Sequence, residues 1–282
     1  MAIGKHLLIV LLLAVPVAAQ QPAFSTRTES VRVDVSVTEQ GQVVRGLRSE
    51  DFELRDNGVL QSIDLTSFEQ LPLNVLLALD LSESVSGPRL TDLKNAATAL
   101  LDGLVPKDKA ALLTFNHAVT LRAVLTADVD RLRAALEAAR PSGETSLFDA
   151  VFSAMSLAGE DAGRDLMLVF TDGRDTASWL SAEMVLQSAR RSNIVLFGLW
   201  LRGSGSARFL RQISNETGGE AFELETSQNL KEHFLAVLDG FRHRYLMSYS
   251  PRGVHRGGWH RIEVRVKGRR ATIRARPGYF DR

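Results

Sequence analysis

Short apolar runs alternate with helical patterns through the middle of this chain, and no other feature restricts its fold as strongly. The runs predict strands at Asn74 to Leu79, Ala110 to Phe115, Val119 to Leu125, Leu166 to Phe170, Ile194 to Trp200 and Glu220 to Leu224. Helical spacing fills the stretches Arg89 to Leu104, Val129 to Ala139, Leu147 to Leu157, Ser181 to Arg190, Ser206 to Ser214 and Asn229 to Phe241. Apolar strands separated by helices are typical of a sheet covered on both faces. We therefore predict an α/β fold with a doubly wound, mostly parallel sheet.

Alternating apolar and polar residues flank this region on both sides and predict half-buried strands. On the N-terminal side these are Val31 to Thr38, Phe52 to Arg55 and, after the tight-turn sequence Asp56-Asn57-Gly58, a strand around Ile63, Leu65 and Phe68. On the C-terminal side they are Tyr245 to Ser250, His260 to Lys267 and Ala271 to Ala275. Neither end has enough strands to bury a core alone. We expect residues 20–71 and 243–282 to pair into one small β-sandwich-like domain beside the middle domain, residues 72–242.

The first 19 residues have the features of a secretory signal peptide. Lys5 and His6 precede an apolar run that ends in Val17-Ala18-Ala19, where small residues suit a signal peptidase. The run is shorter than the roughly 20 apolar residues that span a bilayer, and Pro16 interrupts it. We expect cleavage after Ala19, no transmembrane segment after cleavage, and a secreted or periplasmic location at the bacterial cell envelope.

Composition excludes several kinds of site. The chain of 282 residues contains no cysteine, so it has no disulfide, thiolate metal site or cysteine nucleophile. Its 34 Lys and Arg nearly balance 33 Asp and Glu, so bulk charge favours no class of partner. Arginines are concentrated between Pro251 and Arg282, but they alternate with apolar residues as on the solvated face of a strand. We therefore expect no nucleic-acid partner.

One predicted strand runs directly into an oxygen-rich turn. The apolar residues Leu76 to Leu79 are followed at once by Asp80-Leu81-Ser82-Glu83-Ser84. Ligands of parallel sheets bind outside the carboxyl ends of the strands. Thr145, in a loop that enters a helix, and Asp172, after another buried strand, reach the same edge of the predicted sheet. These five side chains could therefore converge from three loops on one metal ion.

The five residues resemble the metal-ion-dependent adhesion site of the von Willebrand factor type A (VWFA) domain family, written Asp-x-Ser-x-Ser and then a Thr and an Asp. The Val-rich first strand, Val44 to Leu54, Asp56-Asn57-Gly58 and the tail to Tyr279 also look like bacterial exported VWFA-related proteins. The resemblance implies a Rossmann-like fold and a bound Mg2+ or Mn2+, with Ca2+ as a further candidate. Oxygen donors without nitrogen or sulfur agree with such hard cations.

The resemblance also implies a role for each residue. Ser82, Ser84 and Thr145 would supply hydroxyl ligands, whereas Asp80 and Asp172 would act largely through bound water. One coordination position stays open for a carboxylate from a protein or peptide partner. This predicts protein recognition through a divalent cation, and no enzyme activity.

Simpler roles exist for these residues, and one position departs from the family pattern. Ser82, Ser84 and Thr145 could each cap a nearby helix, and Asp172 could be a turn residue. Glu144 occupies a place where the family often has glycine, and with Glu83 it adds negative charge near the site. Asp149 and Asp175 could orient ligands, although surface or capping roles are more common for such residues. 

Two other functions remain open at this point. The same acidic site could serve a metal-dependent hydrolase, or the metal could only stabilise a structural component of the envelope. A hydrolase needs a general base or a second ligand set, and the two aspartates are accompanied by neutral hydroxyls instead. The histidines show no ligand spacing around a carboxylate, and we expect His255 and His260 to lie in a solvated hairpin.

Overall fold

We describe the protein from a computed structural model, in which residues 30–66, 71–158 and 163–281 are described. The expected signal peptide at residues 1–19 lies outside these ranges, as does Phe68. Within them, no helix is long and apolar enough to cross a membrane.

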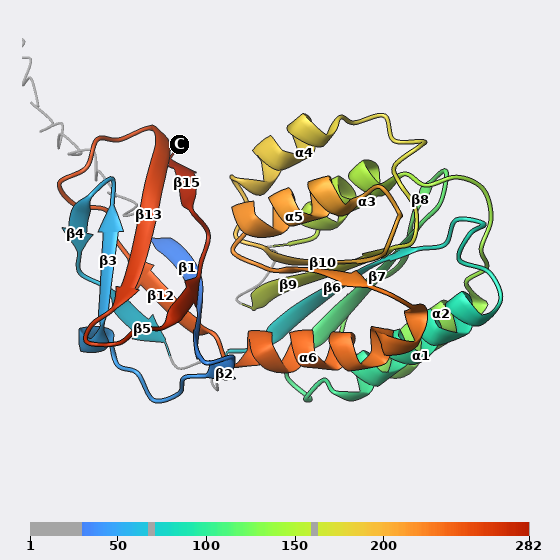
Figure 1. Cartoon of the computed structure of the whole chain (residues 1–282), viewed down its shortest axis with the longest axis horizontal. Coiled ribbons are helices and arrows are strands. Elements are labelled where there is room, and N and C mark those ends of the chain that lie inside the picture. The colour runs from blue at the N-terminus through green and yellow to red at the C-terminus, as the bar shows by residue number, and fades with distance from the viewer. Residues whose placement is uncertain (1–29, 67–70, 159–162, 282) are drawn as a thin grey trace, which may run out of the picture.

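The middle of the chain forms a six-stranded sheet between two layers of helices (Figure 1). Its strand order is β11-β10-β9-β6-β7-β8, and β8 alone among these runs antiparallel to its neighbour. The strands are β6 (Leu73–Asp80), β7 (Lys109–Phe115), β8 (Val119–Thr126), β9 (Arg164–Thr171), β10 (Val195–Leu201) and β11 (Ala221–Leu224). Every residue of β6, β9 and β10 is buried, as expected for strands covered on both faces.

Three helices cover each face of this sheet. One layer consists of α1 (Pro88–Asp102), α2 (Val129–Ala138) and α6 (Leu230–Arg242), and the other of α3 (Leu147–Met155), α4 (Ala182–Ala189) and α5 (Ala207–Glu216). Leu77 and Leu79 of β6 face the first layer, whereas Leu76 and Ala78 face the second. The predicted α/β fold with a mostly parallel sheet is therefore confirmed.

The two ends of the chain form two further antiparallel sheets that pack face to face. The first has the order β14-β1-β12-β5, with β2 beside β1, and the second has the order β15-β13-β3-β4. The N-terminal strands are β1 (Val31–Glu39), β2 (Gln42–Val43), β3 (Phe52–Asp56), β4 (Val59–Gln61) and β5 (Asp64–Thr66), preceded at β3 by a short 3-10 helix (Ser49–Asp51). The C-terminal strands are β12 (Tyr245–Tyr249), β13 (Gly258–Val266), β14 (Thr272–Arg274) and β15 (Gly278–Asp281). A second short 3-10 helix, Ser227–Asn229, precedes α6.

Segments from opposite ends of the sequence lie side by side in this sandwich. Val33 pairs with Met247 across β1 and β12, and Leu54 pairs with Val264 across β3 and β13. The alternate residues of β1, from Val31 to Val37, point into the sandwich core. The expected β-sandwich built from both terminal segments is thus confirmed.

Two details of the sandwich differ from the sequence prediction. The turn at Asn57 and Gly58, both with positive φ, leads into β4 in the sheet of β3, whereas Leu65 belongs to β5 in the opposite sheet. The single strand expected there is therefore two strands. β15 was not predicted, because its four residues follow Pro277 without a longer alternating pattern.

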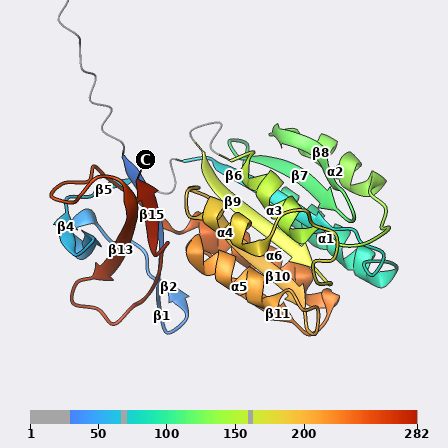
Figure 2. The same cartoon turned by 90° about the horizontal axis from the view of Figure 1, so that it is seen from above.

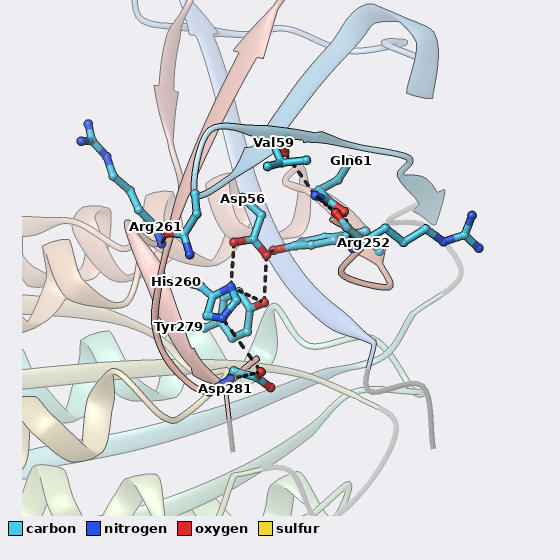
Figure 3. Close-up of polar contacts among 11 residues, drawn as sticks. Asp56, Val59, Gln61, Arg252, His260, Arg261, Tyr279 and Asp281 are labelled. Carbon is cyan, nitrogen blue, oxygen red and sulfur yellow. Dashed lines mark hydrogen bonds and ion pairs between the residues drawn. The ribbon is translucent and has the colours of Figure 1, made fainter. Parts of the chain in front are cut away.

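A buried polar cluster lies inside the sandwich (Figure 3). Asp56 is fully buried, and its carboxylate accepts hydrogen bonds from the hydroxyls of Tyr249 and Tyr279 at 3.0 and 2.9 Å. Its other oxygen lies 2.8 Å from Nδ1 of His260, which is 1% exposed. Nε2 of His260 points toward Asp281, 3.9 Å away. The expectation of a solvated His260 is wrong, because both sheets cover its side chain.

Arginines join the sandwich, which lies beside the central sheet in Figure 2, to residues at or just before the start of the parallel strands. Arg164, which begins β9, forms a buried ion pair with Asp34 of β1. Arg276 donates to the side chain of Asn193 at 3.0 Å and to the carbonyl of Arg190 at 2.9 Å. These contacts place the sandwich at the amino ends of the parallel strands. The carboxyl ends, where Asp80 lies, remain free of it.

Candidate metal centre

Asp80 is the last residue of β6 and is fully buried at the carboxyl edge of the sheet. Oδ1 accepts the backbone N–H of Ser82 at 2.8 Å, and Oδ2 accepts the hydroxyl of Thr171 at 2.5 Å. Burial raises the pKa of Asp80 to about 6, these hydrogen bonds oppose the shift, and the charge of Asp172 adds to it. Asp80 is therefore held in one orientation by the turn that follows β6 and by the last residue of the neighbouring strand β9.

Ser82, Ser84 and Asp172 form a continuous chain of oxygen atoms. The hydroxyls of Ser82 and Ser84 lie 3.1 Å apart, and Ser84 donates to Oδ1 of Asp172 at 2.6 Å. Ser82 is 3% exposed, and the side chain of Asp172 is 0% exposed. The loops after β6 and β9 thus bring together residues 88 positions apart in sequence.

The loop that carries Thr145 is fixed beside both of these loops. The N–H of Glu83 donates to the carbonyl of Gly143 at 3.0 Å, which joins this loop to the Asp-x-Ser-x-Ser turn. The carbonyl of Thr145 accepts the N–H groups of Thr176 and Ala177 at 2.9 and 3.0 Å. A Cβ atom at Gly173 would lie 3.2 Å from the Thr145 hydroxyl, so this hydroxyl lies against the residue after Asp172.

All five residues named by the sequence therefore meet at one edge of the sheet. Their donor atoms are three hydroxyl and two carboxylate groups, a set that fits a hard divalent cation. Within the described residues, no group of three or more His, Cys, Asp or Glu is placed to hold a metal ion. A cation at this edge would therefore need oxygen donors other than carboxylates, and the hydroxyls of Ser82, Ser84 and Thr145 are the candidates named by the sequence.

Helix capping does not account for the serines or the threonine. The N-cap of α1 is Gly87, with no side-chain cap, and the N-cap of α3 is Ser146, also without one. Ser82, Ser84 and Thr145 all precede these caps. Asp172 is likewise more than a turn residue, since it accepts the hydroxyl of Ser84.

The nearby carboxylates of Asp149 and Asp175 organise the loop that follows Asp172. Asp149 accepts the N–H groups of Trp179 and Leu180, both at 2.9 Å, and Asp175 accepts the hydroxyl of Ser178 at 2.5 Å. Asp175 also accepts the N–H of Phe148 at 3.2 Å, so the two carboxylates join the loop at 178–180 to the start of α3. Glu83 and Glu144 are both exposed and lie in the two loops that carry Ser82 and Thr145. Their place beside the site agrees with the negative charge expected there.

Three residues around the site were not identified from the sequence. Thr171 bonds Asp80, Arg89 pairs with Oδ2 of Asp172 at 2.8 Å, and the hydroxyl of Ser206 donates to the carbonyl of Gly173. Ser206 ends the sequence Gly203-Ser204-Gly205-Ser206, a composition typical of a flexible connection. The only sequence signal for Thr171 is its place beside Asp172 at the end of a buried strand.

The fold and this site can be compared with known proteins. A model of the von Willebrand factor type A domain matches residues 74–235, more than half of the chain. The chain belongs to this family. The match covers β6 with its Asp-x-Ser-x-Ser turn, the Thr145 loop and Asp172, and it extends into α6.

Curated relatives of this VWFA-domain protein include inter-alpha-trypsin inhibitor heavy chains. The H2 chain of Mus musculus is 25% identical over 243 residues, covering 79% of this chain and 26% of that protein. The H4 chain of Bos taurus is 24% identical over 223 residues, covering 73% of this chain and 24% of that protein. The chain thus spans about a quarter of the length of these relatives.

Solved structures with the same fold include a von Willebrand factor type A protein from Catenulispora acidiphila. Its TM-score is 0.57 at 14% sequence identity, and the match covers 81% of this chain and 73% of the Catenulispora acidiphila chain. Proximal thread matrix protein 1 from the mussel byssus, with a zinc-occupied MIDAS motif, also has a TM-score of 0.57 at 14% identity. That match covers 66% of this chain and 49% of the mussel chain. At these identities the likeness shows the fold.

Proposed function

We propose that this VWFA-domain protein binds a divalent cation through Asp80, Ser82, Ser84, Thr145 and Asp172. The observation that carries the proposal is the hydroxyl of Ser84, which lies 3.1 Å from that of Ser82 and 2.6 Å from Oδ1 of Asp172. These contacts bring oxygen donors from two loops within the span of one cation's coordination shell. We expect Mg2+ or Mn2+, because both accept hydroxyl and carboxylate oxygens.

We further propose that the bound cation recognises a carboxylate on a protein or peptide partner. The three hydroxyls carry no charge, so the two carboxylates supply all the negative charge of the five donor groups. Two negative charges balance a divalent cation without exceeding its charge. An anionic group can then complete the coordination sphere. The proposed activity is recognition through the metal, without turnover.

Cation binding is tested by thermal unfolding of the chain with EDTA, Mg2+, Mn2+, Ca2+ or Zn2+. Zinc is included because the mussel protein with this fold holds it at the same motif. A cation that binds the folded state raises the melting temperature, by mass action. Unchanged melting of the wild type in every cation would refute the proposed site.

Serine variants make the test specific to the site. Ser84→Ala removes a proposed ligand, whereas Ser86→Ala removes an exposed hydroxyl two residues further along the same loop. We expect the cation-dependent shift to be lost in the first variant and kept in the second. Asp80→Ala should also abolish the shift, and Asp80→Asn preserves the buried side-chain volume if the alanine variant folds poorly.

Recognition is tested separately by capture from the envelope fraction of the native organism. The wild type with Mn2+ is compared with the wild type in EDTA and with Ser82→Ala in Mn2+. We expect a captured protein in the first condition that is absent from the other two. Identical captured proteins in all three would contradict recognition through the metal, even if the cation binds.

We also propose export, with residues 1–19 as a cleaved signal peptide. The apolar run and the small residues at Val17-Ala18-Ala19 support it. Mass spectrometry of the chain isolated from the native organism should give a mature N-terminus at Gln20. An N-terminus at Met1 in the cytoplasmic fraction would contradict export.

A further inference from the structure

Arg89 lies directly against the proposed metal site. Its Nη1 atom is 2.8 Å from Oδ2 of Asp172 and 3.3 Å from the carbonyl oxygen of Ser84. The side chain of Asp172 is 0% exposed, whereas that of Arg89 is 49% exposed. Asp172 therefore faces Ser84 with one oxygen and a guanidinium with the other.

The position of Arg89 on its helix is electrostatically unfavourable on its own. Arg89 is the second residue of α1, after Pro88, and the first turn of this helix contains no acidic residue. The N-terminus of a helix carries a partial positive charge, so a basic side chain there is disfavoured. The ion pair with Asp172 offsets this cost.

The charges around Asp172 determine how strongly the site attracts a cation. Asp80 and Asp172 supply two negative charges, and Arg89 places one positive charge in direct contact with the second of them. A divalent cation beside Oδ1 of Asp172 would lie within a few ångströms of this guanidinium. Like charges at that separation repel, even with partial screening by solvent.

We propose that Arg89 is a built-in counter-cation that weakens metal binding at this site. The proposal rests on the proposed function, since it concerns the affinity of the same five residues. Arg89 neutralises part of the negative charge of the metal-free site, and it leaves the metal-loaded site with a net positive charge. A site tuned in this way holds its cation less tightly and favours an anionic partner group.

The test is isothermal titration of MnCl2 into the EDTA-treated and then desalted chain, at low ionic strength. Arg89→Gln removes the charge but keeps a side chain that can donate to Asp172. Arg89→Ala removes both, and Arg89→Lys keeps the charge. Arg256→Gln is the matched control, because it removes one positive charge from an exposed position in the sandwich.

We expect both neutral variants to bind Mn2+ roughly three- to tenfold more tightly than the wild type, and the gain to shrink at high salt. Arg89→Lys and Arg256→Gln should bind like the wild type. Equal binding in both neutral variants would overturn the proposal. Weaker binding in both would also overturn it and would make Arg89 a positioning residue. Binding by no variant, including the wild type, would refute the metal site itself. Thermal unfolding in EDTA confirms that each variant is folded.

Discussion

Nδ1 of His260 lies 2.8 Å from Oδ1 of Asp56, and neither side chain reaches solvent (Figure 3). The two residues come from opposite ends of the sequence, on the paired strands β3 and β13. Tyr249 and Tyr279 donate to the other oxygen of Asp56. A carboxylate buried in this way is stable only while its hydrogen-bond donors remain.

We predict that Asp56→Asn destabilises the chain by about 3 kcal/mol, because the amide has one acceptor oxygen and no charge where the buried carboxylate has two acceptor oxygens. Urea unfolding measures the change. Asp64→Asn, at an exposed position in β5, is the control and should change stability by less than about 0.5 kcal/mol. Equal stability of both variants would mean that the cluster contributes little.

The ion pair between Arg164 and Asp34 joins the sandwich to the central sheet, and we expect its loss to lower the stability of the chain as much as Asp56→Asn does. Both side chains are buried, at 2% and 10% exposure, so Arg164→Leu leaves an unpaired carboxylate. We predict a loss of about 3 kcal/mol in the free energy of unfolding. Arg265→Leu removes an arginine that is 72% exposed and contacts Glu263 at 3.8 Å, and it should have little effect.

Stability in EDTA should depend on pH through Asp80. Its pKa is raised by burial from 3.8 to about 6, so the folded state binds the proton more tightly than the unfolded state does. This group therefore stabilises the folded chain fully below pH 3.8, and the contribution is lost as the pH rises through 6. Urea unfolding should show that Asp80→Asn removes this decline, which amounts to about 3 kcal/mol at most. A wild type and variant with parallel pH profiles would contradict the assignment.

Cation binding should follow the opposite trend with pH. A proton on Asp80 competes with a cation, because the neutral carboxyl supplies less negative charge to the site. We predict that the rise in melting temperature with Mn2+ is smaller at pH 5 than at pH 7.5. A shift that is the same at both pH values would show that Asp80 does not contribute its charge to cation binding.

Close backbone packing should make Gly219 sensitive to substitution. A Cβ atom there would lie 1.8 Å from the carbonyl oxygen of Leu196, so Gly219→Ala must push β10 away from the segment before β11. We predict a loss of several kcal/mol, or no folded protein. Gly46 has a positive φ of 77° but open space around it, so Gly46→Ala should cost only about 1 kcal/mol. Circular dichroism and urea unfolding of both variants distinguish these cases.

The order of strands and helices in the central sheet could be predicted because it depends on local patterns. Each expected element of this sheet and its helices occurs in the structure with ends shifted by at most two residues. Buried strands and amphipathic helices have different periods, which can be recognised within a few residues. The convergence of Asp80, Thr145 and Asp172 also followed, since the carboxyl ends of parallel strands share one edge.

The burial of His260 also agrees with a local pattern, the alternation along β13. His260 is in phase with Ile262 and Val266, whose side chains face the core, so alternation along β13 places it inside. A histidine in that phase indicates a buried polar partner, which is Asp56. The partner itself could not be identified, because it lies 204 residues away in sequence.

By itself the sequence determined the fold class, the elements of the central sheet and the five oxygen-bearing residues at its edge. These follow from periodicity and from residues next to strand ends, which are local properties of the chain. Only the tertiary structure decided that Arg89 pairs with Asp172, that Thr171 bonds Asp80 and that two sheets bury His260. Such contacts depend on how distant segments pack, and a single polar side chain carries no signal in sequence for which distant partner will satisfy it.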